Sequence, residues 1–187
     1  MIERKTTTGE SICIFDNVFT SPEVASFEEY ASSSLYKRIH ISRSNINSRS
    51  NNEDFFGSIF SRLDIENFGL FETTGFKYIN TIFTEFNIEN IKRAWILCTE
   101  SGTKYLYHTD EGLKGITFLY YMNSFWHPEW GGETIFCNNF GEPDIAIACK
   151  PNRVVVFPSY IPHKPSGITK DARTRYSFTT TFILNEQ

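Results

Sequence analysis

The segment from Arg93 to the end of the chain constrains the fold most, because it alternates short apolar stretches with turn residues. Six stretches have the length and the β-branched and aromatic content of strands: 94–99, 116–122, 133–136, 146–148, 153–157 and 175–184. Glycine and proline separate these stretches, and both residue types favour turns. Many short strands joined by turns predict a sandwich or a barrel.

Helix signals prevail before this segment. Thr20 offers a capping hydroxyl and Pro22 follows in the first turn, which predicts a helix that ends near Leu35. Apolar residues at helical spacing predict further helices within 55–63 and 75–86. The first half of the chain is therefore expected to support the strands of the second half.

Two shorter segments complete the expected organisation. A strand is expected at 12–15, and the serines and asparagines of 43–52 predict an exposed loop. No repeat or low-complexity linker divides the chain, and 187 residues suit one domain. We expect an α+β fold in a single domain, residues 1–187. In it, 1–92 form a mainly helical support region and 93–187 form the β core that carries the functional site.

The composition argues against some classes of function. Charged residues make up 21% and hydrophobic residues 40%, as in ordinary globular proteins, and the 16% of aromatic residues predicts large rings around any pocket. A net charge of −4 and a pI near 5.6 argue against general binding to nucleic acid. The basic residues that cluster are Lys37, Arg38, His40, Arg43 and Arg49. We interpret this cluster as a solvated loop.

The sequence carries no sign of export or of membrane insertion. The first residues lack a long apolar run after their charges, so no signal peptide is expected. No stretch approaches the roughly 20 apolar residues of a membrane span. The four cysteines are far apart and form no CxxC pair, which argues against a zinc site of the usual spacing. These features predict a reduced, cytoplasmic protein that does not bind membranes.

Three side chains are candidates for one metal site. His108 and Asp110 are two residues apart after an apparent strand end, so in an extended chain they point the same way. His163 follows an apolar strand and a proline-rich turn. Two imidazoles and one carboxylate on one side of a metal leave positions open for a cosubstrate and O2, as in non-haem Fe(II) oxygenases. Taken singly, His108 and Asp110 could form surface hydrogen bonds, and His163 could cap or pack in its turn.

The last strand adds a candidate binding group for a carboxylate. Alternation places Arg175, Ser177, Thr179 and Thr181 on one face and mainly aromatic residues on the other. Such a strand is buried on its aromatic side and can line a polar pocket on the other. The planar guanidinium of arginine grips a carboxylate with two parallel hydrogen bonds. In the stretch 115–123, Tyr121 could offer its hydroxyl to the same carboxylate, or be one more core aromatic. The polar face of the last strand could also simply face solvent.

The order of motifs in about residues 94–185 resembles the Fe(II)/2-oxoglutarate-dependent dioxygenases, and among them the prolyl 4-hydroxylase-like branch. The motifs that carry the resemblance are, in chain order, 101–105 (SGTKY), 108–110 (HTD), 120–123 (YYMN), 130–134 (WGGET), 153–159 (RVVVFPS), 162–163 (PH) and 175–177 (RYS). Each motif is weak by itself, and the ordered set is specific. The fold that the resemblance implies is a double-stranded β-helix, or jelly roll, with the N-terminal helices packed on its major sheet.

The resemblance also implies roles for individual residues. His108, Asp110 and His163 would be the iron ligands. Arg175 would bind the distal carboxylate of 2-oxoglutarate, helped by Tyr121 and Thr179, and Tyr105 would lie near the opening of the metal site. Arg173 has the same parity as Arg175 and competes with it for this role. Arg175 is preferred because the strand continues directly from it.

The implied activity is hydroxylation with Fe(II), 2-oxoglutarate and O2, with release of succinate and CO2 and with ascorbate as a supporting reductant. Halogenating relatives carry a small residue in place of Asp110, so the carboxylate favours hydroxylation. The substrate stays open between a prolyl residue of a protein or peptide and a free amino acid, a small metabolite or a nucleobase. Its recognition is expected from 43–52, from 126–130 and from Tyr160. Two rival hypotheses are a catalytically silent β-helix that only binds a ligand and a metal-dependent cupin that does not use 2-oxoglutarate.

Overall fold

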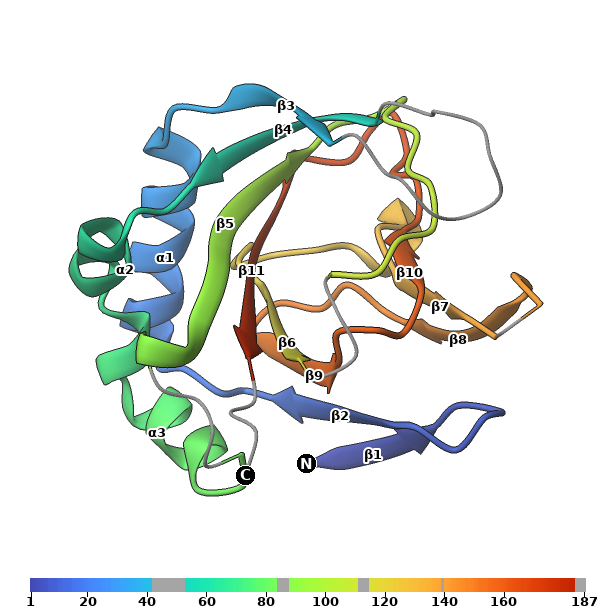
Figure 1. Ribbon diagram of the computed structural model, residues 1–187. Coiled ribbons are helices and arrows are strands. Elements are labelled where there is room, and N and C mark those ends of the chain that lie inside the picture. The colour runs from blue at the N-terminus through green and yellow to red at the C-terminus, as the bar shows by residue number, and fades with distance from the viewer. Residues whose placement is uncertain (42–52, 84–87, 111–114, 139, 184–187) are drawn as a thin grey trace.

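Two antiparallel sheets face each other in this computed structural model, which describes residues 1–41, 53–83, 88–110, 115–138 and 140–183 (Figure 1). The large sheet contains, in spatial order, β1 (Ile2–Lys5), β2 (Ser11–Asp16), β9 (Arg153–Pro158), β6 (Gly115–Tyr121), β11 (Arg175–Ile183), β5 (Ile91–Thr99), β4 (Glu53–Ile59) and β3 (Lys37–Ile41). The small sheet contains β10 (His163–Pro165), β7 (Thr134–Cys137) and β8 (Pro143–Ile147). This arrangement is a double-stranded β-helix, or jelly roll, as expected.

The helices lie on the face of the large sheet that points away from the small sheet (Figure 1). They are α1 (Ser21–Ser33), α2 (Arg62–Phe68) and α3 (Thr74–Asn80), accompanied by the 3-10 turns η1 (Leu70–Glu72), η2 (Ile88–Asn90) and η3 (Pro128–Trp130). α1 begins where predicted, because the carboxylate of Glu23 accepts hydrogen bonds from the backbone N–H and the hydroxyl of Thr20. No helix in the described part of the chain is long and apolar enough to cross a membrane.

The large sheet separates two hydrophobic cores. On the helix side, Phe68 of α2 packs against Phe178 of β11 with ring centroids 5.1 Å apart. Between the sheets, Phe136 of β7 packs against Phe157 of β9 with centroids 4.9 Å apart. Each fully buried ring of this kind stabilises the fold by about 1.5–3 kcal/mol. The space between the sheets is shared by this second core and by the polar pocket described below.

Strand alternation sorts side chains between the helix side and the pocket side. In β11, Phe178 and Phe182 belong to the helix-side core, whereas Arg175, Ser177 and Thr179 line a pocket between the sheets. The predicted parity of this strand is confirmed. In β6 the same rule sends Phe118 and Tyr120 to the helices and sends Leu119 and Tyr121 to the small sheet.

The six strands expected in the second half all overlap observed strands, and the early strand corresponds to β2. The helix expected at 55–63 is wrong, because β4 occupies most of that range and α2 begins only at Arg62. In β4, Phe56 pairs with Cys98 and Ser58 with Ile96 of β5. The apolar residues of 55–59 have helical spacing, but backbone hydrogen bonds to the edge of the sheet stabilise the extended conformation more than a helix.

The region 1–92 contains more strand than expected. β1, β2, β3 and β4 extend the large sheet at its two edges, beside the helices that were foreseen there. The helix expected at 75–86 corresponds to α3, which is shorter. The loop expected at 43–52 lies outside the described residues. The four cysteines are buried and free.

An ion-paired carboxylate ties β2 to β9 and gives a prediction on pH-dependent stability. The guanidinium of Arg153 donates to both carboxylate oxygens of Asp16, at 2.6 and 3.0 Å, and Lys150 donates a further bond at 2.9 Å. The bonds from Arg153 lower the pKa of Asp16 to about 2. A lowered carboxyl pKa contributes stability above its unfolded value, near pH 4, and this contribution is lost as the pH falls toward the folded value.

Asp16→Asn is therefore expected to lower the free energy of unfolding at pH 7 by about 1–2 kcal/mol. The difference in unfolding free energy between wild type and variant should narrow steadily below about pH 4, because protonation of Asp16 removes its stabilising ion pair in the wild type. Urea denaturation at a series of pH values measures this gap. A gap that stays constant from neutral pH to about pH 3 would contradict the assignment.

Candidate active site

Reciprocal backbone hydrogen bonds hold the two candidate histidines next to each other. His108 follows β5 in the connection to β6, and His163 begins β10. The N–H of His108 donates to the carbonyl of His163 at 2.9 Å, and the N–H of His163 donates to the carbonyl of His108 at 2.8 Å. The N–H of Asp110 donates to the carbonyl of Ser159 at 2.8 Å. The backbone thus brings residues more than fifty positions apart into one site.

The side chains of these three residues converge. Nε2 of His108 lies 3.8 Å from Oδ1 of Asp110, and Nε2 of His163 lies 3.4 Å from Oδ2. One ligand atom from each residue can be chosen so that all lie within 4.8 Å of one another. Ligand atoms bound at about 2.1 Å to one octahedral ion are about 3 Å apart when adjacent. The set is therefore close to the spacing that a single ion requires.

Backbone carbonyls determine which imidazole nitrogen faces the site. Nδ1 of His108 lies 3.2 Å from the carbonyl oxygen of Leu106, and Nδ1 of His163 lies 2.9 Å from that of Ile161. A carbonyl oxygen can only accept, so each Nδ1 carries the proton. In the neutral ring, Nε2 then has a free lone pair directed at Asp110. Histidines that bind metals typically donate a hydrogen bond from one ring nitrogen and keep the other nitrogen, here Nε2, free for the metal.

The triad opens into a pocket between the sheets. The side chains that line it come from six strands and the connection after β5. They are Trp95, Leu97, His108, Asp110, Leu119, Thr134, Phe157, His163, Pro165, Arg175, Ser177 and Thr179. The triad and the guanidinium of Arg175 therefore share one pocket.

Arg175 has the environment of a carboxylate-binding residue. It is 2% exposed, one of its terminal nitrogens donates to Ser177 Oγ at 3.2 Å, and its guanidinium carbon lies 5.0 Å from the ring centroid of Tyr121. Its Nε has no hydrogen-bond partner among the described residues. A buried cation with a spare donor is costly unless an anion joins it. A carboxylate in the pocket would satisfy this donor.

Arg173, the competing arginine, lies outside the pocket. It is exposed, and its guanidinium carbon lies 6.0 Å from the ring centroid of Phe125. The two arginines have the same parity, but Arg175 is the first residue of β11 and Arg173 precedes the strand. The structure brings only Arg175 to the pocket.

The other predicted pocket residues take different positions. Thr179 lines the pocket, whereas the hydroxyl of Tyr121 is bonded to Thr134 Oγ1 at 2.8 Å and only its ring contacts the guanidinium. Burial raises the pKa of Tyr121 to about 12, although the positive charge of Arg175 acts in the opposite direction. The hydroxyl of Tyr105 is hydrogen-bonded to Thr99 Oγ1 at 2.8 Å, and Thr99 of β5 pairs with Arg175 of β11.

The Gly131-Gly132 turn lies against Arg175. Both glycines have positive φ, 75° and 80°, which other residues rarely adopt. A Cβ on Gly132 would lie 3.0 Å from Cδ of Arg175 and 3.2 Å from the Trp126 ring. The turn therefore needs glycine both for its backbone conformation and for the space that the arginine occupies.

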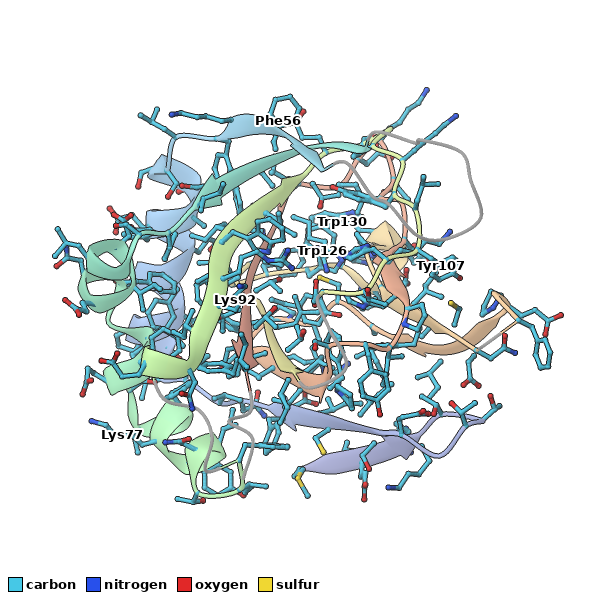
Figure 2. The ribbon with its side chains drawn as sticks, viewed as in Figure 1. Phe56, Lys77, Lys92, Tyr107, Trp126 and Trp130 are labelled. Atoms are coloured by element: carbon cyan, nitrogen blue, oxygen red, sulfur yellow. The ribbon has the colours of Figure 1, made fainter. Side chains whose placement is uncertain are left out.

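The loop 126–130 forms an aromatic cluster whose members differ in exposure. Trp126 and Trp130 pack edge to face with ring centroids 5.3 Å apart (Figure 2). Trp126 is buried, and its indole N–H donates to the carbonyl of Gly131 at 2.9 Å. Phe125 and His127 are exposed, and their rings lie beside the indole of Trp130. Trp126 is thus a packing residue, and its neighbours form part of the surface.

Several side chains at the site were not foreseen from the sequence. Trp95 and Leu97 of β5 line the pocket, and Arg93 and Thr117 contact Asp110. Strand alternation could have predicted that Trp95 and Leu97 face the pocket. The contacts to Asp110 depend on how the connection between β5 and β6 folds back over the sheet.

Comparison with known proteins gives a family match in the second half of the chain. Residues 94–183 match the family described as the 2OG-Fe(II) oxygenase superfamily. No curated protein sequence matches the chain.

Solved structures resemble this one over nearly its whole length. A prolyl 4-hydroxylase from Pseudomonas putida has a TM-score of 0.63 at 13% identity, covering 95% of this chain and 94% of that one. A prolyl hydroxylase from Trichoplax adhaerens, in complex with a hypoxia inducible factor peptide fragment, has 0.63 at 18%, covering 92% and 83%. A 2OG-Fe(II) oxygenase family oxidoreductase from Burkholderia pseudomallei has 0.67 at 12%, covering 92% and 84%. Identities this low show a shared fold.

The matched segment contains the triad and Arg175 together. The donor set fits Fe(II), since two neutral imidazoles and one carboxylate are the ligands of non-haem Fe(II) oxygenases. Residues 94–183 thus match the 2OG-Fe(II) oxygenase superfamily, whose members use Fe(II), 2-oxoglutarate and O2, and prolyl 4-hydroxylases are among the structural neighbours of the chain.

Proposed function

We propose that the chain is an Fe(II)- and 2-oxoglutarate-dependent hydroxylase that releases succinate and CO2. In this proposal His108, Asp110 and His163 hold the iron, and Arg175 binds the distal carboxylate of 2-oxoglutarate. The observation that carries it is the shared pocket, with three convergent ligand side chains and a fully buried arginine that has a spare donor. Bound Fe(II) would supply the activation of O2, which no side chain can perform.

The side chains supply binding, orientation and exclusion of water. The carbonyls of Leu106 and Ile161 keep the Nε2 lone pairs of the histidines free for the metal. Arg175 holds one end of the dicarboxylate, so the other end is directed toward the triad. Phe157 and Leu119 form apolar walls, which strengthen the ion pair with Arg175 by excluding water. Asp110 occupies the position of the small residue of halogenating relatives, which favours hydroxylation.

For the substrate, we propose a prolyl residue of a protein or peptide. The support is the likeness to two prolyl hydroxylases, one of them solved with a peptide. The exposed Phe125, His127 and Tyr160 offer apolar and polar contacts to such a chain. A free amino acid, a small metabolite or a nucleobase is the alternative. Mass spectrometry of peptide and metabolite pools, searched for a gain of one oxygen, separates the two.

The central test is succinate formation from 2-oxoglutarate by the purified chain with Fe(II), ascorbate and O2. Succinate should appear, should need Fe(II), and should stop when O2 is removed or a chelator is added. A chain that binds Fe(II) and 2-oxoglutarate but forms no succinate with any substrate pool would favour a catalytically silent binding domain. Metal binding without affinity for 2-oxoglutarate would favour a cupin.

The Gly131-Gly132 turn gives a prediction on the cosubstrate. Gly132→Ala is expected to raise the KM for 2-oxoglutarate by about threefold to tenfold, because the added Cβ displaces the stem of Arg175. Gly141→Ala is the matched control, since Gly141 has nearly the same φ, 79°, but nothing within 4 Å of an added Cβ. Both variants should lose similar stability from backbone strain. An equal KM in both would show that the turn does not position Arg175.

A further inference from the structure

We infer that Arg93 and Thr117 are positioning residues that orient the carboxylate of Asp110 for the metal. The inference rests on the proposed role of His108, Asp110 and His163 as ligands. Asp110 is 2% exposed, and both of its carboxylate oxygens accept hydrogen bonds. Arg93 Nη2 donates to Oδ1 at 3.1 Å, and Thr117 Oγ1 donates to Oδ2 at 2.7 Å.

Arg93 is itself held in place on two sides. The same Nη2 donates to the backbone carbonyl of Asp110 at 3.0 Å, so one nitrogen fixes both the backbone and the side chain of that residue. The guanidinium carbon lies 3.9 Å from the ring centroid of Trp95, which lines the pocket. Stacking on an indole further restricts the rotation of the guanidinium.

The sheet register places both donors beneath Asp110. Thr181 of β11 pairs with Arg93 of β5 on one side and with Thr117 of β6 on the other. Two residues earlier in β11, Thr179 pairs with Trp95 and with Leu119, and these three line the pocket. The donors therefore form the row directly next to the pocket floor, on the two strands that flank β11.

The arrangement determines how the carboxylate can bind. An ionised carboxylate has about four lone-pair directions. One hydrogen bond to each oxygen stops rotation of the group and leaves a lone pair on each oxygen for an ion. A metal would then meet a carboxylate that is already oriented, without the cost of ordering it. Outer partners of this kind commonly account for about 10- to 100-fold in metal affinity.

Charge and positioning predict opposite effects for Arg93. If Arg93 acted only as a nearby cation, Arg93→Met would bind Mn(II) more tightly, because a repelling charge is removed. If it positions Asp110, the variant binds more weakly. Thr117→Val changes no charge and removes only the donor, so it reports orientation alone.

The experiment is titration of the full-length chain, stripped of metal, with Mn(II) by calorimetry and with Co(II) by its visible absorption. Arg93→Met and Thr117→Val should each bind Mn(II) about 10- to 100-fold more weakly than wild type. Their Co(II) spectra should differ from that of wild type, because the carboxylate is free to turn.

Arg153→Met is the matched control, since it also breaks a part-buried Arg–Asp pair, that with Asp16, away from the triad. It should bind Mn(II) within about twofold of wild type. If Arg93→Met binds Mn(II) as tightly as wild type or more tightly, and its Co(II) spectrum is unchanged, the inference is wrong for Arg93. The same result for Thr117→Val would make it wrong for Thr117. A wild-type chain that binds neither metal would instead overturn the proposed metal site.

Discussion

A chain with His108→Ala is expected to form almost no succinate from 2-oxoglutarate. Removal of one of the proposed ligands leaves Asp110 and His163, which are too few to hold Fe(II) firmly. Loss of an outer partner costs about 10- to 100-fold in metal affinity, so loss of a direct ligand should cost more than about 100-fold. His108 is preferred over His163 for this test, because His163 packs against Phe136 and Phe157 and its removal would leave a cavity. Succinate formation and Mn(II) affinity, measured on the same preparations, should fall together.

His127→Ala is the control for loss of a histidine. His127 is exposed, and its ring contacts Trp130 and the N–H of Glu129 away from the triad. It should leave Mn(II) affinity unchanged. If His127→Ala lost Mn(II) binding and His108→Ala retained it, the proposed triad would be wrong.

The second half of the fold was predictable because its strands carry strong local signals. Alternation in β11 places an aromatic face toward the helices, and this parity, together with the start of the strand at Arg175, directs Arg175 to the pocket. β4 was not predictable in the same way. Its apolar residues have helical spacing, and only the free edge of β5 makes an extended conformation better for them.

The candidate site shows a similar limit. The hypothesis that His108, Asp110 and His163 share one ion came from residue types and order, and the structure places them within 4.8 Å. The groups that surround them could not be foreseen. The carbonyl that fixes His163 belongs to Ile161, in a turn with no local signal for that geometry. The bond from Arg93 to Asp110 joins a strand to a connection that returns over it. Such contacts arise from packing.

Arg175→Met is expected to weaken 2-oxoglutarate binding by about 30- to 100-fold, whereas Arg173→Met should change it by less than about twofold. The reason is burial. Arg175 is 2% exposed, and without it a carboxylate would enter the pocket with its charge unpaired. Such a loss costs about 2–3 kcal/mol or more. Arg173 is exposed to solvent, which screens its charge and makes its loss small. Methionine keeps an apolar stem of similar length, so packing against Tyr121 changes little.

The measurement is the dissociation constant of 2-oxoglutarate for the Mn(II)-loaded chain without O2, which separates binding from turnover. Mn(II) affinity should be equal in wild type, Arg175→Met and Arg173→Met, because among the described residues neither arginine is an ion-pair partner of Asp110 or of the two histidines. A larger loss in Arg173→Met would move the anchor to that residue. It would also mean that the segment before β11 turns inward when the cosubstrate binds, since Arg173 lies outside the pocket. If both variants lost little affinity for 2-oxoglutarate, and to the same extent, the cosubstrate would not pair with the spare donor of Arg175. The proposed binding position of 2-oxoglutarate in the pocket would then be wrong.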